Sequence, residues 1–323
     1  MKDKLIIHIG LGKAASSTMQ SKIFNLIAEN LGYYYISNKS EVKNKIDLDL
    51  KNQMTKHCTK MILGLNVDKI DFPNFSLVSN EGFSSYRQPH FYEEFAQKNL
   101  EAFGEDVHIV LIIRKPSNFL NSIYVQCCVH EKPIVPPEFF FINEKNYSER
   151  YPENTYNISK ADTFKLIEYY KSRFRKVSIL KYEVLKNGNY LQKIFKFDDI
   201  TKNKISKIFE SIKINRSLGK NGLRFLTLIN NTLQIFGFSF KPKYSNKILL
   251  LRLTDYNKIE TLKQKKFFIK IITKINKILL NPIFIDKIFG YKKIKINFDS
   301  LNIDIKKLDE EYDRIPDYQV FEK

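Results

Sequence analysis

The stretch of sequence that decides the fold reads His8-Ile-Gly-Leu-Gly-Lys-Ala-Ala-Ser-Ser-Thr-Met-Gln20. It starts in an apolar run typical of a strand, passes through a glycine-containing turn with one lysine, and continues as an amphipathic helix that opens with three hydroxyl residues. The turn carries Gly10, Gly12 and Lys13, and the hydroxyl residues are Ser16, Ser17 and Thr18. Unpaired N–H groups at a helix start, the helix dipole and a lysine all favour phosphate, so this order predicts an anion site.

The spacing in this turn differs from that of the nucleoside triphosphatases. Their loop reads G-x-x-x-x-G-K-[ST], with the lysine directly before the hydroxyl that binds Mg²⁺. Here two alanines separate Lys13 from Ser16, and no glycine lies five residues before Gly12. The turn therefore predicts a phosphate site of another kind.

Four strand signals, at 4–10, 75–79, 107–113 and 177–182, alternate with helical stretches at 16–31, 91–103, 117–128 and 160–174. This alternation predicts an α/β fold with a parallel sheet and helices on both faces. Ligands of such sheets bind at the carboxyl ends of the strands. Lys13, Glu81, Arg114 and Tyr182 all stand at or just beyond those ends, which predicts one shared site.

A second motif follows the apolar run at 107–113. It consists of Arg114, Pro116, Ser122 and Tyr124. Together the two motifs resemble the sulfotransferases that use 3′-phosphoadenosine-5′-phosphosulfate (PAPS), whose loops read K-x-G-[TS]-[TS] and R-x-P…S-x-Y. The resemblance implies a P-loop-like three-layer fold with a central parallel sheet flanked by helices. Ala15 replaces the usual glycine, so we expect an ordinary backbone φ there.

The resemblance also implies roles for individual residues. Lys13 would stabilise charge on the leaving group, and Arg114 with Ser122 would bind the 3′-phosphate. Tyr182 would stack on adenine, although a tyrosine packed at a strand end explains it equally well. The remaining residues implied for donor binding are Gly12, Ala15, Ser16, Ser17, Thr18 and Arg216.

The acceptor has to lose a proton, so a general base is required. We expect Glu81 in this role, because it ends a strand and related enzymes use a glutamate. The alternatives are His8, His90 and His130. No metal site is expected, since the five histidines and three cysteines show no paired ligand spacing.

The chain divides, by sequence, into a sulfotransferase-like α/β core at 1–222 and a mostly helical, basic region at 223–323. A loop-rich insertion at 129–158, broken by prolines and rich in aromatic residues, suits either an acceptor lid or a loop pinned to the core. We expect the 223–323 region to pack on the same core. It carries no recognisable motif.

Composition narrows the functional classes. A chain of 323 residues with 43% hydrophobic residues is globular, and its net charge of +19 favours anionic ligands. We expect no nucleic-acid partner, because the lysines are dispersed and no nucleic-acid-binding motif is present. Few cysteines, no signal peptide and no 18-residue apolar run predict a cytoplasmic protein, with contact at the inner membrane face left open.

The sequence therefore predicts transfer of a sulfuryl group from PAPS to a hydroxyl or amine of a carbohydrate or glycolipid, as in polysaccharide biosynthesis. The donor would leave as 3′-phosphoadenosine-5′-phosphate (PAP). Two alternatives remain open: a P-loop small-molecule kinase, and a non-catalytic polyanion-binding protein held by the net charge of +19. The particular acceptor and the oligomeric state stay open.

Overall fold

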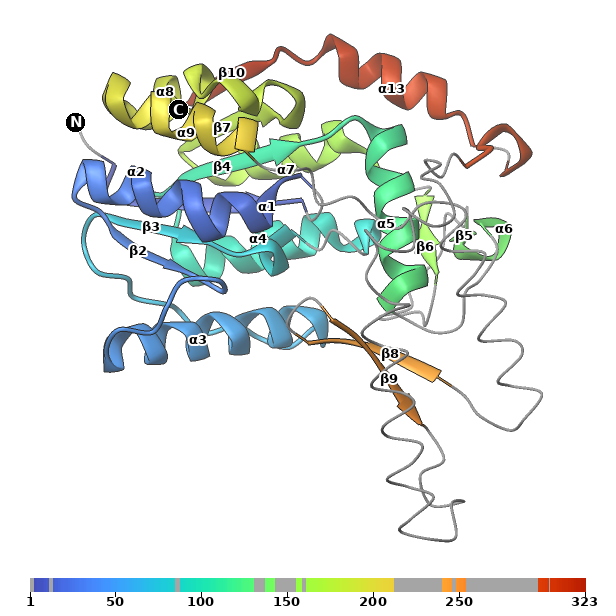
Figure 1. Ribbon diagram of the computed structural model, residues 1–323, viewed down its shortest axis with the longest axis horizontal. Helices are drawn as coiled ribbons and strands as arrows, with labels where there is room; N and C mark the ends of the chain where they lie inside the picture. Colours follow the sequence, from blue (N-terminus) through green and yellow to red (C-terminus); the bar gives the residue numbers. More distant parts are fainter. Residues whose placement is uncertain are drawn as a thin grey trace, which may run out of the picture. The chain divides into compact units, whose positions relative to one another are not determined.

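The computed structural model describes residues 3–11, 14–84, 88–130, 137–142, 155–158, 161–211, 240–245, 248–253, 296–301 and 303–323 (Figure 1). The chain forms two compact units. The first comprises Met1–Phe119, Phe141–Ile212 and Asn302–Lys323, and the second comprises Leu120–Phe140 and Lys213–Leu301. The predicted motifs lie mainly in the first unit.

A six-stranded sheet forms the centre of the first unit, in the order β10-β7-β4-β1-β3-β2. Its first five strands along the chain are parallel, and β10 runs antiparallel to β7. The strands are β1 (Leu5–Gly10), β2 (Tyr34–Ser37), β3 (Ser76–Ser79), β4 (His108–Ile113), β7 (Lys176–Lys181) and β10 (Tyr318–Glu322). Every residue of β4 is buried, as expected for a central parallel strand.

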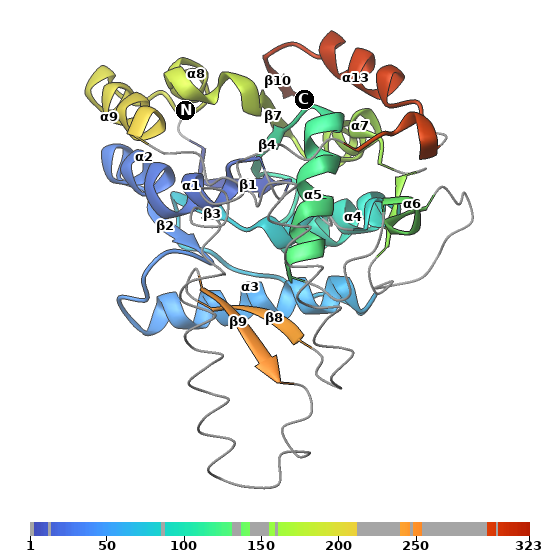
Figure 2. The same cartoon turned by 45° about the vertical axis from the view of Figure 1, so that its right-hand side comes forward.

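Helices cover both faces of this sheet, which confirms the predicted three-layer α/β arrangement (Figures 1 and 2). One layer contains α1 (Ser16–Thr18), the π-helical turn η1 (Met19–Ile23), α2 (Phe24–Leu31), α8 (Asn189–Phe195) and α9 (Asp199–Ser211). The other layer contains α3 (Lys45–Ile62), α4 (Tyr92–Phe103) and α7 (Thr163–Arg173). Within the layers, α2 packs on α9, and α4 packs on α3 and α7.

Local sequence signals explain where several of these helices begin. Asp162 caps α7 by accepting hydrogen bonds from the N–H groups of Phe164 at 2.8 Å and Lys165 at 3.1 Å. Asn44 caps α3 in the same way through the N–H of Asp47. Strands β2 and β10 were not predicted. β2 is only four residues long, and β10 lies in the region that we expected to be helical.

The chain connections change direction between β1 and β4. The connection after β1 leads to β2 at one edge of the sheet, whereas the connection after β4 leads to β7 on the other side. Adjacent strands whose connections leave in opposite directions leave a crevice at their carboxyl ends, where α/β proteins bind ligands. The two motifs recognised in the sequence follow these two strands.

The described parts of the second unit are short. They include α6 (Pro137–Phe140), the antiparallel hairpin of β8 (Phe240–Ser245) and β9 (Ile248–Leu253), and the turn η7 (Asp299–Leu301). The rings of Tyr124 and Phe140 pack together at a centroid distance of 5.4 Å. Most of the 223–323 region and of the 129–158 insertion lies outside the described residues. Within the 223–323 region, α13 (Ile305–Arg314) and β10 belong to the first unit.

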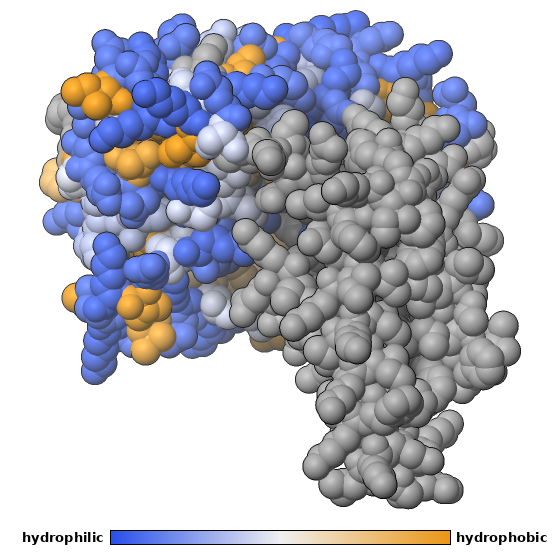
Figure 3. Space-filling view, in the orientation of Figure 1, coloured by the Kyte–Doolittle hydropathy of each residue, from blue (hydrophilic) through white to orange (hydrophobic). Residues whose placement is uncertain are grey.

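The visible face of the described residues is mainly hydrophilic (Figure 3). Large apolar side chains that remain exposed stand in separate small groups, such as Ile46 and Leu48 on α3 and Ile200 on α9. Isolated apolar residues of this kind are normal on protein surfaces. The apolar sequence pattern is therefore largely used to build the core between sheet and helices.

Candidate functional site

The structure describes most of the predicted site residues, but not all. Gly12, Lys13 and Arg216 lie outside the described residues, as does the side chain of His130. Ser122 lies on α5 (Pro116–His130) and belongs to the second unit. The remaining predicted residues follow β1, β3, β4 and β7 in the first unit.

The backbone at Ala15 corrects the sequence-based expectation. Its φ is +63° and its ψ is 9°, so an alanine adopts the left-handed conformation that glycine usually occupies. The carbonyl of Ala15 accepts hydrogen bonds from Thr18 and Met19, both at 2.9 Å, while the N–H of Ala14 donates to Leu11 at 3.1 Å. This turn closes only if the backbone reverses at Ala15, at a steric cost of about 1–2 kcal/mol.

The helix that follows the turn starts without a side-chain cap. Thr18 and Met19 donate to the Ala15 carbonyl, whereas the N–H groups of Ala15, Ser16 and Ser17 have no backbone partner among the described residues. The Ser16 side chain is buried and its hydroxyl donates to the Leu11 carbonyl at 3.2 Å. Ser17 is exposed and Thr18 is partly exposed. Among its described residues, the turn thus combines three N–H groups without a backbone partner with the two accessible hydroxyls of Ser17 and Thr18.

Gly10 is required by close packing beneath this turn. A Cβ atom at position 10 would lie 2.7 Å from both the Cε1 atom of His8 and the Oγ atom of Ser16. No side chain fits at such distances without displacing these groups. The tight approach of β1 to the start of the helix therefore depends on the missing Cβ.

His8 is a buried, neutral core residue. Its Nδ1 atom lies 2.7 Å from the Ser79 hydroxyl on β3, and its ring packs on Phe24 at a centroid distance of 4.8 Å. Burial lowers the pKa of His8 to about 3. Burial therefore makes His8 a weaker base than an ordinary histidine, which favours Glu81 over His8 as the candidate base.

Glu81 lies directly after β3, at the start of the 3₁₀ turn η2 (Glu81–Ser84), and is partly exposed. One hydrogen bond holds this turn beside the end of β1, and a second one fixes the turn internally. The hydroxyl of Ser84 donates to the Gly10 carbonyl at 2.9 Å, and the Asn80 side chain accepts from the Gly82 N–H at 2.8 Å. Glu81 therefore stands at the same sheet edge as the turn after β1, whereas the alternative His90 lies further along in η3 (Pro89–Phe91).

A buried hydrogen-bond network supports the η2 turn from behind. The Asn99 amide on α4 donates to the Phe83 carbonyl at 2.8 Å, and the Tyr170 hydroxyl on α7 donates to the same carbonyl at 3.1 Å. His57 on α3 completes the network, with its Nε2 atom 3.0 Å from the Asn99 carbonyl oxygen. Three helices of one layer thereby hold the segment that carries Glu81.

Arg114 and Tyr182 lie in contact with each other. The guanidinium carbon of Arg114, just after β4, lies 4.9 Å from the ring centroid of Tyr182, the first residue of η5 (Tyr182–Asn187) after β7. Such cation–π contacts contribute roughly 0.5–2 kcal/mol, depending on burial. The structure thus brings together two of the residues predicted to bind the donor, although they are far apart in the sequence.

A set of residues on the C-terminal helix α13 carries no signal in the sequence. Asp309 accepts a hydrogen bond from the Ser117 N–H at 3.0 Å, and the Tyr312 hydroxyl donates to Glu183 at 2.6 Å. Asp313 forms an ion pair with Lys115 at 2.7 Å, which raises the pKa of this lysine. The capping residue Asp304 signals a helix here, but no local pattern announces partners almost two hundred residues away.

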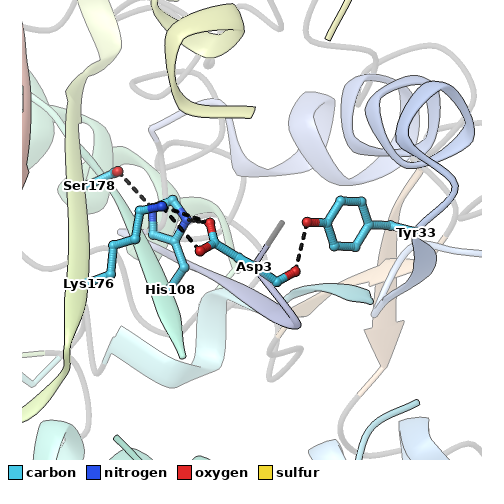
Figure 4. A network of polar contacts seen from close by, with 5 residues as sticks. All are labelled: Asp3, Tyr33, His108, Lys176 and Ser178. Atoms are coloured by element: carbon cyan, nitrogen blue, oxygen red, sulfur yellow. Dashed lines mark hydrogen bonds and ion pairs between the residues drawn. The ribbon is translucent and has the colours of Figure 1, made fainter. Parts of the chain in front are cut away.

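A separate polar network lies at the opposite, amino ends of the strands (Figure 4). Asp3 contacts the Nδ1 atom of His108 at 2.8 Å and the ammonium group of Lys176 at 2.9 Å. The Nε2 atom of His108 lies 2.8 Å from the Ser178 hydroxyl. Burial raises the pKa of Asp3, but the hydrogen bonds from His108 and Lys176 outweigh burial and lower this pKa to about 2. Burial lowers the pKa of His108. This network ties β1, β4 and β7 together at the edge away from the candidate site.

Among the described residues, no cluster of three histidine, cysteine or acidic side chains is arranged to hold a metal ion. In the same part of the chain, no helix combines the length and the apolar character needed to cross a bilayer. Comparison with models of protein families, with curated proteins and with solved structures finds no match.

Proposed function

We propose that this chain is a cytoplasmic sulfotransferase that moves a sulfuryl group from PAPS to a hydroxyl or amine of a carbohydrate or glycolipid. The observation that carries the proposal is the contact of Arg114 with Tyr182 at the carboxyl ends of β4 and β7. A cationic fork next to an aromatic ring supplies the two groups that a phosphorylated adenosine requires.

The turn after β1 supports the other half of the donor site. An alanine that adopts the conformation of glycine at position 15 keeps the backbone shape of the K-x-G loop despite the substitution. The N–H groups of Ser16 and Ser17 and the accessible hydroxyls of Ser17 and Thr18 suit a 5′-phosphosulfate. The sequence resemblance adds Gly12, Lys13, Ser122 and Arg216 to the proposed donor-binding residues.

The proposed reaction is an in-line displacement at sulfur. The acceptor oxygen or nitrogen forms a bond to sulfur while the bond between sulfur and the bridging oxygen of PAPS breaks. Glu81 takes the proton of the acceptor, and PAP leaves with the electron pair of the broken bond. Fixed cations and backbone N–H groups stabilise the charge that develops on the leaving phosphate, which is mainly a matter of positioning and electrostatics.

Binding of PAP tests this proposal directly. Calorimetry without added metal should show micromolar PAP binding that is far tighter than AMP binding, because AMP lacks the 3′-phosphate. Arg114→Ala should weaken PAP binding by about 10–100-fold and AMP binding much less. Arg114→Lys is the matched control, because it keeps the positive charge but loses the planar guanidinium fork. Its affinity for PAP should fall between that of the wild type and that of Arg114→Ala.

Three results would overturn the proposal. Equal affinity for PAP and AMP, unaffected by Arg114→Ala, would show that the proposed site does not recognise a 3′-phosphate. Tight ATP binding that depends on Mg²⁺ would instead identify a small-molecule kinase. Weak and strongly salt-dependent binding of many anions would identify a polyanion-binding protein.

A further inference from the structure

The C-terminal helix α13 contacts both segments that carry the candidate donor-binding residues. Arg114 and Tyr182 follow different strands, β4 and β7, and each is next in sequence to a residue that α13 holds. Lys115 pairs with Asp313, and Glu183 accepts a hydrogen bond from Tyr312.

Glu183 is the junction of these contacts. One of its carboxylate oxygens lies 3.4 Å from the Lys115 backbone nitrogen, and the other accepts the hydrogen bond of the Tyr312 hydroxyl at 2.6 Å. A single carboxylate thus links the turn after β4, the turn after β7 and α13. The 2.6 Å bond from Tyr312 is short and charge-assisted, so it holds the Glu183 carboxylate in place, whereas the 3.4 Å contact with the Lys115 N–H is a weaker link to the turn after β4.

Tyr312 is well placed for this task because the rest of its side chain is fixed. The residue is 3% exposed, and the ammonium group of Lys181 lies 4.9 Å from its ring centroid. Burial and the neighbouring Glu183 raise the pKa of the Tyr312 phenol, so it remains a neutral hydrogen-bond donor. Its hydroxyl therefore reaches Glu183 from a rigid base.

Asp309 holds the third point of contact. Its carboxylate accepts a hydrogen bond from the Ser117 N–H, in the first turn of α5 and three residues after Arg114. The start of this helix is thus already provided with a negative partner from within the chain. An anionic ligand near this turn has to rely on Arg114 rather than on the helix start.

From these contacts we infer that α13 is a positioning element of the nucleotide site, in which Tyr312 and Asp309 set the placement of Arg114 and Tyr182. This inference rests on the proposed function and extends it to a region in which the sequence shows no motif. Neither Tyr312 nor Asp309 needs to touch the nucleotide. Each acts through the turn that carries a binding residue.

The test compares Tyr312→Phe and Asp309→Asn with the control Glu310→Gln on the same helix. Glu310 is exposed, and its change removes the same charge as Asp309→Asn. We expect each of the first two variants to weaken PAP binding about tenfold and to reduce the preference for PAP over AMP. Tyr312→Phe removes the hydrogen bond to Glu183, and Asp309→Asn replaces the charge-assisted bond from the Ser117 N–H by a weaker neutral one. The control should leave both quantities unchanged. A merely structural role would lower the melting temperature but would not alter the ratio of the two affinities.

A second measurement uses the protein without ligand. The NMR signal of the Arg114 Nε–H group should shift in Tyr312→Phe, because the Tyr182 ring moves relative to the guanidinium. If wild-type protein does not bind PAP, the proposed function fails, and this shift alone decides the role of α13. An unchanged shift with an unchanged PAP to AMP ratio would overturn the inference. Tighter PAP binding in Asp309→Asn than in Glu310→Gln would also overturn it, since Asp309 would then compete with the ligand.

Should Tyr312→Phe fail to fold, Asp309→Asn still decides the question. It preserves the shape of the side chain and can still accept the Ser117 hydrogen bond, but without the negative charge. Loss of PAP preference in this variant supports the positioning role, and wild-type preference contradicts it.

Discussion

Replacing His8 by asparagine should make the protein less sensitive to acid. His8 is fully buried between β3 and α2, and burial lowers its pKa from 6.5 to about 3. The unfolded chain therefore binds a proton at this residue between these two values and the folded chain does not. Stability from a neutral His8 is fully present above about pH 6.5 and is lost as the pH falls.

The size of the effect follows from this difference in pKa. Each pH unit below the unfolded pKa of 6.5 costs about 1.4 kcal/mol while the folded protein stays unprotonated, so about 2 kcal/mol is lost by about pH 5. This figure requires only that the folded pKa lies well below 5. His57 and His108 also have lowered pKa values, so the wild-type protein should lose more than this in total.

Urea denaturation followed by circular dichroism, at about pH 8 and about pH 5, measures the effect. Asparagine does not titrate, and its side chain can replace the bond of the His8 Nδ1 atom to Ser79. The stability lost between the two pH values should be about 2 kcal/mol smaller in His8→Asn than in wild type. Equal losses would refute the reasoning, because they would mean that the folded protein protonates His8 as easily as the unfolded chain does.

Two further predictions concern stability. Ala15→Gly should raise the stability by about 0.5–1 kcal/mol, because relief of the left-handed backbone strain outweighs the added freedom of the unfolded chain. Ala15→Val should lower the melting temperature. A glycine variant that is less stable than wild type in thermal unfolding would indicate an ordinary φ at this position. Asp3→Asn should lower the free energy of unfolding by about 1–2 kcal/mol above pH 4, because the Asp3 carboxylate stabilises the fold only while it is charged. The variant should also lack the loss of stability that Asp3 causes between its unfolded pKa of 3.8 and its folded pKa of about 2. Identical acid unfolding curves of Asp3→Asn and wild type would contradict this.

Much of the core could be predicted because its signals are local. Apolar runs of strand length at 5–9 and 107–113 became the central strands β1 and β4, and Asp162 starts α7 through its own side chain. Alternation of strands and helices is sufficient to predict a parallel sheet with two helical layers. The carboxyl-end positions of Glu81, Arg114 and Tyr182 then follow from the chain direction alone.

The structure decided how the residues at the site are related. The residue type alone predicts an ordinary φ at Ala15, yet the hydrogen bonds around the turn after β1 require the left-handed conformation. Likewise, Arg114 and Tyr182 are each a plausible surface or packing residue by themselves. Only the pairing of β4 with β7 puts the ring within 4.9 Å of the guanidinium carbon.

The sequence by itself determined the strands β1, β3, β4 and β7 and the helical stretches that alternate with them, because hydrophobic periodicity and capping act over a few residues. The tertiary structure alone decided the partners of the C-terminal segment. Asp309 and Ser117 are 192 residues apart, and β10 joins the edge of the sheet at β7. Such contacts depend on where complete elements pack, and the free energy of that packing is shared over the whole core rather than encoded in any one stretch of the chain.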